Sequence, residues 1–329
     1  PKRIEIEQVT LRDDASDVTV GGSFEGGHFK IAYKGRLAGS SIDHIFVEPL
    51  VSVGELQGDF RADGDFKRPD ATTATGNLQG SMIRLPPVLA IPVTIEKLSL
   101  EAKDTVLLVK SATVSSGESR IDVSGSVTYT KDKFIVDADM RGEKWVVAVA
   151  PEKPAKPAKS DQSDQSDRPD KAETQADSKP AGQPSSIIGN PEKMQALLHT
   201  LWALPVAGTV RVDIGLLRVG RMQISPLVAS AVIAAPRVDL RIARAALCSI
   251  ALSGGLTMTE ENAEGTIKLS ARGAQVAESI TCLTDQRLQI TGKFDLDGNF
   301  SATGKPGTLL GAVQGKFSAV ATNARINKF

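Results

Sequence analysis

Residues 288–302 read LQITGKFDLDGNFSA, and apolar positions alternate with polar ones along the stretch. Successive side chains of a β-strand point to opposite faces, so the pattern predicts a strand with one apolar and one solvated face. The apolar positions are Leu288, Ile290, Phe294, Leu296, Phe300 and Ala302. Such strands are typical of antiparallel sheets that face water on one side.

The same alternation recurs in both halves of the chain. Its apolar positions include Ile121, Val123, Val127, Tyr129, Phe134, Val136, Ala138, Met140, Val210, Val212, Ile214, Val238, Leu240 and Ile242. Polar residues such as Asp122, Asp137 and Arg211 stand between them. We therefore expect a mainly β protein with a long antiparallel sheet and one short amphipathic helix.

A short unit recurs within these strands, in which a glycine lies midway between two apolar residues. It occurs at 20–24, 33–37, 56–60, 78–82, 123–127, 290–294, 296–300 and 313–317. The glycine falls on the apolar face, where a missing side chain permits a bend or a close approach. Repetition of this unit predicts a strongly twisted and coiled sheet. Asp63-Gly64, Asp297-Gly298 and Lys305-Pro306-Gly307 are predicted to be hairpin turns.

The middle of the chain has a different composition. Residues 151–186 contain no Val, Ile, Leu, Met or aromatic residue, and many Pro, Lys, Asp, Ser and Gln. Such a segment buries too little apolar surface to offset the entropy lost on ordering, so we predict a disordered linker or insertion. It divides the chain into an N-terminal β region, 1–150, and a C-terminal β region, 187–329.

One amphipathic helix is predicted at about 191–203. Asn190 suits the cap and Pro191 the first turn. Helical spacing then places five apolar residues on one stripe, namely Met194, Leu197, Leu198, Leu201 and Trp202. The stripe has three candidate partners: a sheet, an open apolar groove, or a membrane surface.

Composition argues against several function classes. The chain has 39 basic and 39 acidic residues, whereas nucleic-acid binding needs a surplus of cations. Aromatic residues make up only 4%, so stacking platforms and sugar clefts are poorly supplied. Three histidines lie far apart, and no nucleophile elbow, phosphate loop, dinucleotide fingerprint or zinc-binding helix is present. We expect no enzyme activity, no metal and no cofactor.

The sequence leaves the cellular compartment open at this point. No stretch approaches the ~18 apolar residues that span a bilayer. The chain begins at Pro1 rather than Met, so we expect a fragment or processed form of a longer protein. Cys248 and Cys282 would be two small buried hydrophobes in a reducing compartment and bonded in an oxidising one.

The C-terminal part has an order of features that resembles a known family. They are LPVAGTVRVD at 204–213, ISPL at 224–227, VDLRIARAALC at 238–248, CL at 282–283, LQITGKFDLDG at 288–298, GKP at 304–306, LL at 309–310, GKFSA at 315–319 and NARINKF at 323–329. This order is similar to the C-terminal region of AsmA-like proteins, particularly the YhdP-like branch. Ala324 replaces a glycine of the family pattern.

The resemblance implies a repeating β-groove protein of the Gram-negative envelope. Such a protein, anchored to the inner membrane, spans the periplasm and conducts phospholipid between membranes, with acyl chains and other envelope proteins as its partners. Because the periplasm is oxidising, the resemblance also implies a Cys248–Cys282 disulfide. From the pattern alone, the apolar rows suit a closed core and an open groove equally, and the resemblance favours the groove.

The predicted groove consists of rows of aliphatic and aromatic side chains with no catalytic residue. Its candidates are Ile121, Val123, Val127, Phe134, Val136, Val210, Val212, Ile214, Val238, Leu240, Ile242, Leu288, Ile290, Phe294, Leu296 and Phe300. Two other functions compete with the lipid conduit: a scaffold or chaperone for outer-membrane protein assembly, and a polysaccharide-processing protein. A closed-core structural β protein is the remaining alternative.

Overall fold

The computed structural model describes residues 3–41, 54–66, 68, 71–88, 91–147, 205–219, 222–283 and 290–326. They form one sheet of sixteen strands that pair in sequence order. The strands are β1 (Arg3–Arg12), β2 (Asp17–Glu25), β3 (His28–Ala38), β4 (Glu55–Asp65), β5 (Thr73–Val88), β6 (Ile91–Lys103), β7 (Val106–Ser116), β8 (Ser119–Tyr129), β9 (Phe134–Val147), β10 (Val206–Val219), β11 (Met222–Ala234), β12 (Arg237–Leu247), β13 (Ile250–Thr259), β14 (Ala263–Gln275), β15 (Ile290–Gly304) and β16 (Gln314–Ile326). The prediction of a mainly β protein is confirmed.

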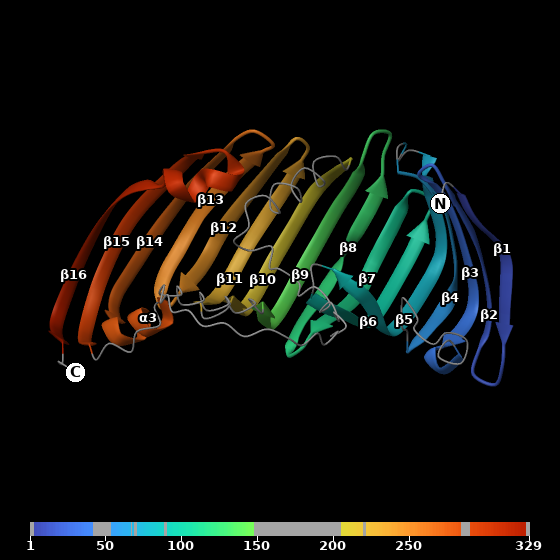
Figure 1. The fold of residues 1–329 in the computed structure, drawn as a ribbon, viewed down its shortest axis with the longest axis horizontal. Coiled ribbons are helices and arrows are strands. Elements are labelled where there is room, and N and C mark those ends of the chain that lie inside the picture. Colours follow the sequence, from blue (N-terminus) through green and yellow to red (C-terminus); the bar gives the residue numbers. More distant parts are fainter. Residues whose placement is uncertain are drawn as a thin grey trace, which may run out of the picture.

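The sheet does not close on itself. Figure 1 shows the strands side by side, with β1 at one end of the molecule and β16 at the other. Each strand pairs only with its neighbours in sequence, so β1 and β16 are the two free edges. The halves on either side of the composition break contribute nine and seven strands to this single sheet.

One strand pair departs from the predicted antiparallel arrangement. β9 and β10 run parallel, with Val206 opposite Phe134 and Val219 opposite Val147. A two-residue hairpin joins antiparallel neighbours, but parallel strands need a connection that returns to the starting end of the sheet. Val147 and Val206 are 59 positions apart in the sequence, far more than a hairpin turn uses.

The pairing register shows which side chains share a face of the sheet. Paired residues share a face and successive residues alternate, so the face of Val210 is followed from strand to strand. We call it the apolar face and the opposite side the charged face. Val136 and Leu240, for example, lie on the apolar face, whereas Asp137 and Arg241 lie on the charged face.

Close backbone contacts explain some of the glycines on the apolar face. Gly35 has φ +119°, and a Cβ there would lie 2.0 Å from the carbonyl oxygen of Asp17. Gly76 has φ +108°, and its Cβ would lie 1.8 Å from the carbonyl oxygen of Asp59. Neither space admits a side chain. The expectation of close approach at apolar-face glycines is confirmed at Gly35, and Gly76 extends it to a glycine outside the unit.

Two of the three predicted turns are wrong. Asp63-Gly64 lies inside β4 and Asp297-Gly298 lies inside β15. At Gly298 a Cβ would lie 2.8 Å from the ring of Phe300, so this glycine makes room for an aromatic side chain rather than for a turn. The third lies where a strand ends: β15 stops at Gly304, and Pro306 begins a 3-10 helix.

Two short helices flank the sheet at opposite strand ends: α3 (Val276–Leu283) after β14 and the 3-10 helix η2 (Pro306–Ala312) after β15. The predicted helix at 191–203, the linker at 151–186 and Leu288 lie outside the described residues. Among the residues that are described, no helix is both long and apolar enough to cross a membrane.

Candidate functional site

A continuous row of apolar or glycine residues crosses fifteen of the sixteen strands on the apolar face. From β1 to β15 it reads Leu11, Val18, Gly35, Gly58, Leu78, Leu100, Val109, Gly125, Ala138, Val210, Ala231, Leu240, Leu256, Gly265 and Ala302, each directly paired with the next. We call it the apolar row. No polar side chain interrupts it, and it passes through the parallel pair of β9 and β10.

The register places all fifteen described groove candidates on this face. Ile121 and Ile214 are each 5% exposed, and the others are half-buried. The half-buried members are Val123, Val127, Phe134, Val136, Val210, Val212, Val238, Leu240, Ile242, Ile290, Phe294, Leu296 and Phe300. Their role as a ligand surface stays a prediction.

The candidate set omitted most of the N-terminal part of the face. Side chains from β2 to β7 that share it are Val18, Val20, Tyr33, Phe60, Leu78, Leu98, Leu100, Leu107 and Val109. The signal was present in the sequence, because Val20, Tyr33, Phe60 and Leu78 each belong to a copy of the glycine-centred unit. The candidate set also omitted Leu256 on β13 and Ile267 on β14, which lie on the same face.

No second sheet covers this face within the described part of the chain. Ile31 on β3 remains 48% exposed, Ile267 on β14 41% and Phe317 on β16 69%. Exposed apolar side chains on an uncovered face are typical of a surface that meets an apolar ligand or partner. The closed-core alternative needs a layer that these residues do not supply.

The charged face carries cross-strand ion pairs. Lys30 contacts Asp63 at 3.0 Å, and Arg36 contacts Glu55 at 2.8 Å. Their side chains are about half exposed, so these ion pairs add little to the folding stability of the protein. The charged groups remain in contact with water. The charged face also carries exposed apolar side chains, among them Leu108 and Val232, so the ion pairs rather than a purely polar surface distinguish it.

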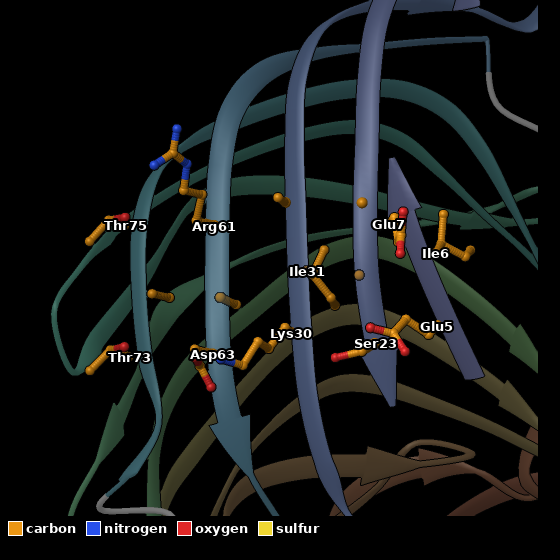
Figure 2. A pocket seen from close by; sticks show the side chains of 15 residues that line it. Glu5, Ile6, Glu7, Ser23, Lys30, Ile31, Arg61, Asp63, Thr73 and Thr75 are labelled. Atoms are coloured by element: carbon orange, nitrogen blue, oxygen red, sulfur yellow. Dashed lines mark ion pairs between the residues drawn. The ribbon is translucent and has the colours of Figure 1, made fainter. Parts of the chain in front are cut away.

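A hollow of about 430 Å³ lies where β1 to β5 meet. Figure 2 shows Lys30, Arg61 and Asp63 around it, together with Glu5 and other polar side chains. Asp63 is held by Lys30 and by His28, whose Nε2 lies 3.3 Å away. The residues around this hollow come from both faces of the sheet, since Ile6, Ile31 and Ala62 belong to the apolar face.

In the part of the chain that the structure describes, the clearest pKa shifts come from burial and from exposed ion pairs. Burial raises the pKa of Tyr33 to about 12, and its hydroxyl donates to the carbonyl of Leu56 at 2.6 Å. The hydrogen bond from Lys110 lowers the pKa of Glu101, and that from Arg237 lowers the pKa of Asp239, both as ordinary exposed pairs. Among the described residues, no group of three or more His, Cys, Asp or Glu is placed to hold a metal.

A disulfide joins Cys248 and Cys282, with their Cα atoms 5.6 Å apart. It ties α3 to the turn between β12 and β13. Ser279 on α3 supports the junction, because its hydroxyl donates to the carbonyl of Cys248 at 2.9 Å and its side chain is almost fully buried. The pairing implied by the family resemblance is confirmed.

A second hollow, of about 250 Å³, lies on the apolar face beneath η2. β12 to β15 provide its floor, and Leu309 of η2 and Val313 border it. We call it the η2 pocket.

Comparison with protein-family models, with curated proteins and with solved structures gives no match. The resemblance to AsmA-like proteins therefore rests on the sequence features alone, and the function is argued from the apolar face.

Proposed function

We propose that the protein conducts phospholipid between the inner and outer membranes of a Gram-negative envelope, with acyl chains lying on the apolar face. The observation that carries the proposal is the apolar row, which continues across fifteen strands without a polar side chain. An acyl chain that moves along this row would contact only apolar side chains and glycines.

The energetics favour a surface of this kind for lipid. Each methylene removed from water contributes about 0.8 kcal/mol, so a long chain gains on the order of 10 kcal/mol. Dispersion and hydrophobic contacts have no preferred direction, so they retain the chain while allowing it to slide. The charged face keeps the other side of the sheet in water.

In this proposal the sheet coils into an open trough whose inner surface is the apolar face. Glycines such as Gly35 and Gly76 permit the close strand approach that curvature needs. A trough shields acyl chains on its floor and leaves the head groups at its open side. The half-buried state of Val127 and Phe294 agrees with side chains that neighbours flank but no layer covers.

We place the protein in the periplasm, held at the inner membrane through segments absent from this chain and meeting other envelope proteins. The Cys248–Cys282 disulfide supports this location, because structural disulfides persist in oxidising compartments. The reaction class is transport, with no catalytic step, nucleic acid or cofactor.

Site-specific photocrosslinking tests the proposal. A photoreactive amino acid at Val127 or Phe294 should capture phospholipid from envelope membranes, and mass spectrometry of the adduct identifies it. The matched control is Lys293, which neighbours Phe294 on the charged face. Capture at Lys293 alone, or equal capture at Phe294 and Lys293, would contradict the conduit.

A scaffold for outer-membrane protein assembly is the second candidate, and the free edge of β16 favours it. Residues 314–325 are exposed throughout, with Val320 at 60%. An exposed strand edge is a template for pairing with another strand. Crosslinking from β16 to unfolded barrel precursors, without lipid capture at Val127, would favour this candidate.

A further inference from the structure

The η2 pocket differs from the rest of the apolar face because a helix borders it from above. Leu309 is half-buried and borders the pocket. Pro306 begins η2 directly after β15, which ends at Gly304. The side chains around the pocket are Leu240, Ile242, Leu256, Ile267, Phe300, Ala302, Leu309 and Val313. Elsewhere on the described sheet the row has no such roof.

The size and lining of the pocket match one hydrocarbon chain. Its volume of about 250 Å³ holds roughly eight groups of water or methylene size, at ~30 Å³ each. An apolar cavity of ~150 Å³ already stays dry and takes up a small hydrocarbon. Two acyl chains side by side would not fit.

The polar residues at the pocket do not offer a head-group site. Thr266 and Ser301 are the polar residues among its neighbours, and the register places both on the charged face of the sheet. The lining carries no charged side chain. A lipid could therefore insert only the apolar end of a chain.

We propose that the η2 pocket is a retention site that binds the terminal methylenes of a single acyl chain while the head group stays outside. The inference rests on the proposed function for the identity of the cargo, and adds a specific stopping place to it. The pocket selects chains by the length that it can enclose, whereas the open face does not.

Gly265 offers a precise way to fill the pocket. It lies on the apolar row in β14, and a Cβ there would lie 3.5 Å from Cδ1 of Leu256, an ordinary contact. Gly265→Val therefore places methyl groups into the pocket space without a backbone clash. Lys268→Val is the matched control, since it adds the same side chain on the exposed charged face of β14.

The probe is a twelve-carbon fatty acid with a photoreactive diazirine at its methyl end, incubated with the full chain. Mass spectrometry of the digested protein maps the adducts. We expect adducts on peptides that contain Phe300 or Leu309, reduced at least fivefold in Gly265→Val and unchanged in Lys268→Val. Leu309→Ser, which weakens the roof without filling the pocket, should also reduce them.

The outcomes separate the two proposals. Adducts at Leu309 that do not change in a folded Gly265→Val protein overturn the retention site, and so do adducts spread evenly over the apolar face. In both of these cases, lipid capture at Val127 would still support the proposed lipid conduit. Absence of adducts anywhere on the apolar face counts against both. If circular dichroism shows Gly265→Val unfolded, the Leu309→Ser result decides.

Discussion

Val212 of β10 lies directly opposite Met140 of β9, in the parallel pair where the two halves of the chain meet. A one-residue slip would place Asp139 or Arg141 opposite Val212 and turn every side chain of one half to the wrong face. The register at this seam is therefore strongly specified by solvent preference. The apolar face continues from one half to the other because of it.

Neighbouring aliphatic residues on β9 give a matched test of the two faces. Val136 lies on the apolar face, and Ile135 lies on the charged face with 37% exposure. We expect Val136→Asp to lower the phospholipid that copurifies with the protein at least twofold, because an acyl chain that covers the carboxylate must remove its water. Ile135→Asp should leave it unchanged.

The measurement is extracted lipid per mole of protein. Val136→Asp should remain soluble and cost about 1–3 kcal/mol in the free energy of unfolding. Aggregation of Val136→Asp with a normal Ile135→Asp would indicate a sealed core instead of a ligand surface. Equal lipid loss in both variants would also count against the conduit.

Glycine substitutions should separate strained from roomy positions on the same face. Gly35→Ala forces a side chain to within 2.0 Å of the Asp17 carbonyl at φ +119°, so we expect a loss of about 2–4 kcal/mol in unfolding free energy. Gly265→Ala meets only an ordinary contact and should cost less than about 1 kcal/mol. Urea denaturation measures both, and equal effects would mean that Gly35 is not a required close approach.

Strand identity and facing could be predicted because both are local properties. The alternation around Val123 and Phe294 fixes which side chains share a face, whatever the strand pairs with. The turn rule, in contrast, misread Asp297-Gly298, because an Asp-Gly pair suits a turn and here lies in mid-strand beside Phe300. The local sequence does not show that the glycine accommodates a ring.

Strand order, the parallel seam and the η2 pocket depend on contacts between distant residues. The pocket joins Leu240, Leu256 and Leu309, which lie on separate elements. Residues 306–312, PGTLLGA, have no alternation that would mark them as part of a binding surface. The N-terminal share of the face was predictable from the glycine-centred unit, but those units were interpreted as architecture rather than as surface.

The two tyrosines should titrate above the normal range. Burial raises the pKa of Tyr33 from 10.0 to about 12, and it also raises that of Tyr129. Because the folded pKa exceeds the unfolded one, the stability from the neutral Tyr33 phenol is complete below about pH 10 and is lost as pH rises towards 12. Tyr129→Phe leaves Tyr33 as the single tyrosine, so phenolate absorbance reports it directly.

Tyr33→Phe is the control for this titration. It removes the hydrogen bond to Leu56, at a cost of about 1 kcal/mol near neutral pH, and should flatten the loss of stability above pH 10. A Tyr33 phenol that ionises near pH 10 in the folded Tyr129→Phe protein would show that Tyr33 is open to solvent.

Loss of the disulfide should destabilise the contact between α3 and the turn that joins β12 to β13. The cysteines are 34 residues apart, so the crosslink contributes about 3–4 kcal/mol if loop entropy dominates. We expect Cys248→Ala with Cys282→Ala to lower the unfolding free energy by that amount and to increase hydrogen exchange mainly in α3. Non-reducing mass spectrometry of envelope-derived protein should detect the bond, and free thiols there would argue against the periplasmic location.

Ion pairs and apolar packing both act at the seam between β9 and β10. Arg211 on the charged face donates to Asp137 at 2.8 Å and to Asp139 at 3.3 Å, but it is half exposed. Arg211→Gln should therefore cost at most about 1 kcal/mol, and ~0.5 M salt should remove most of the difference by screening. Val212→Ala, on the half-buried apolar face, should cost about 1–2 kcal/mol with or without salt. Denaturant unfolding at two ionic strengths distinguishes them, and a salt-insensitive Arg211→Gln effect larger than that of Val212→Ala would mean that the charged face sets the register.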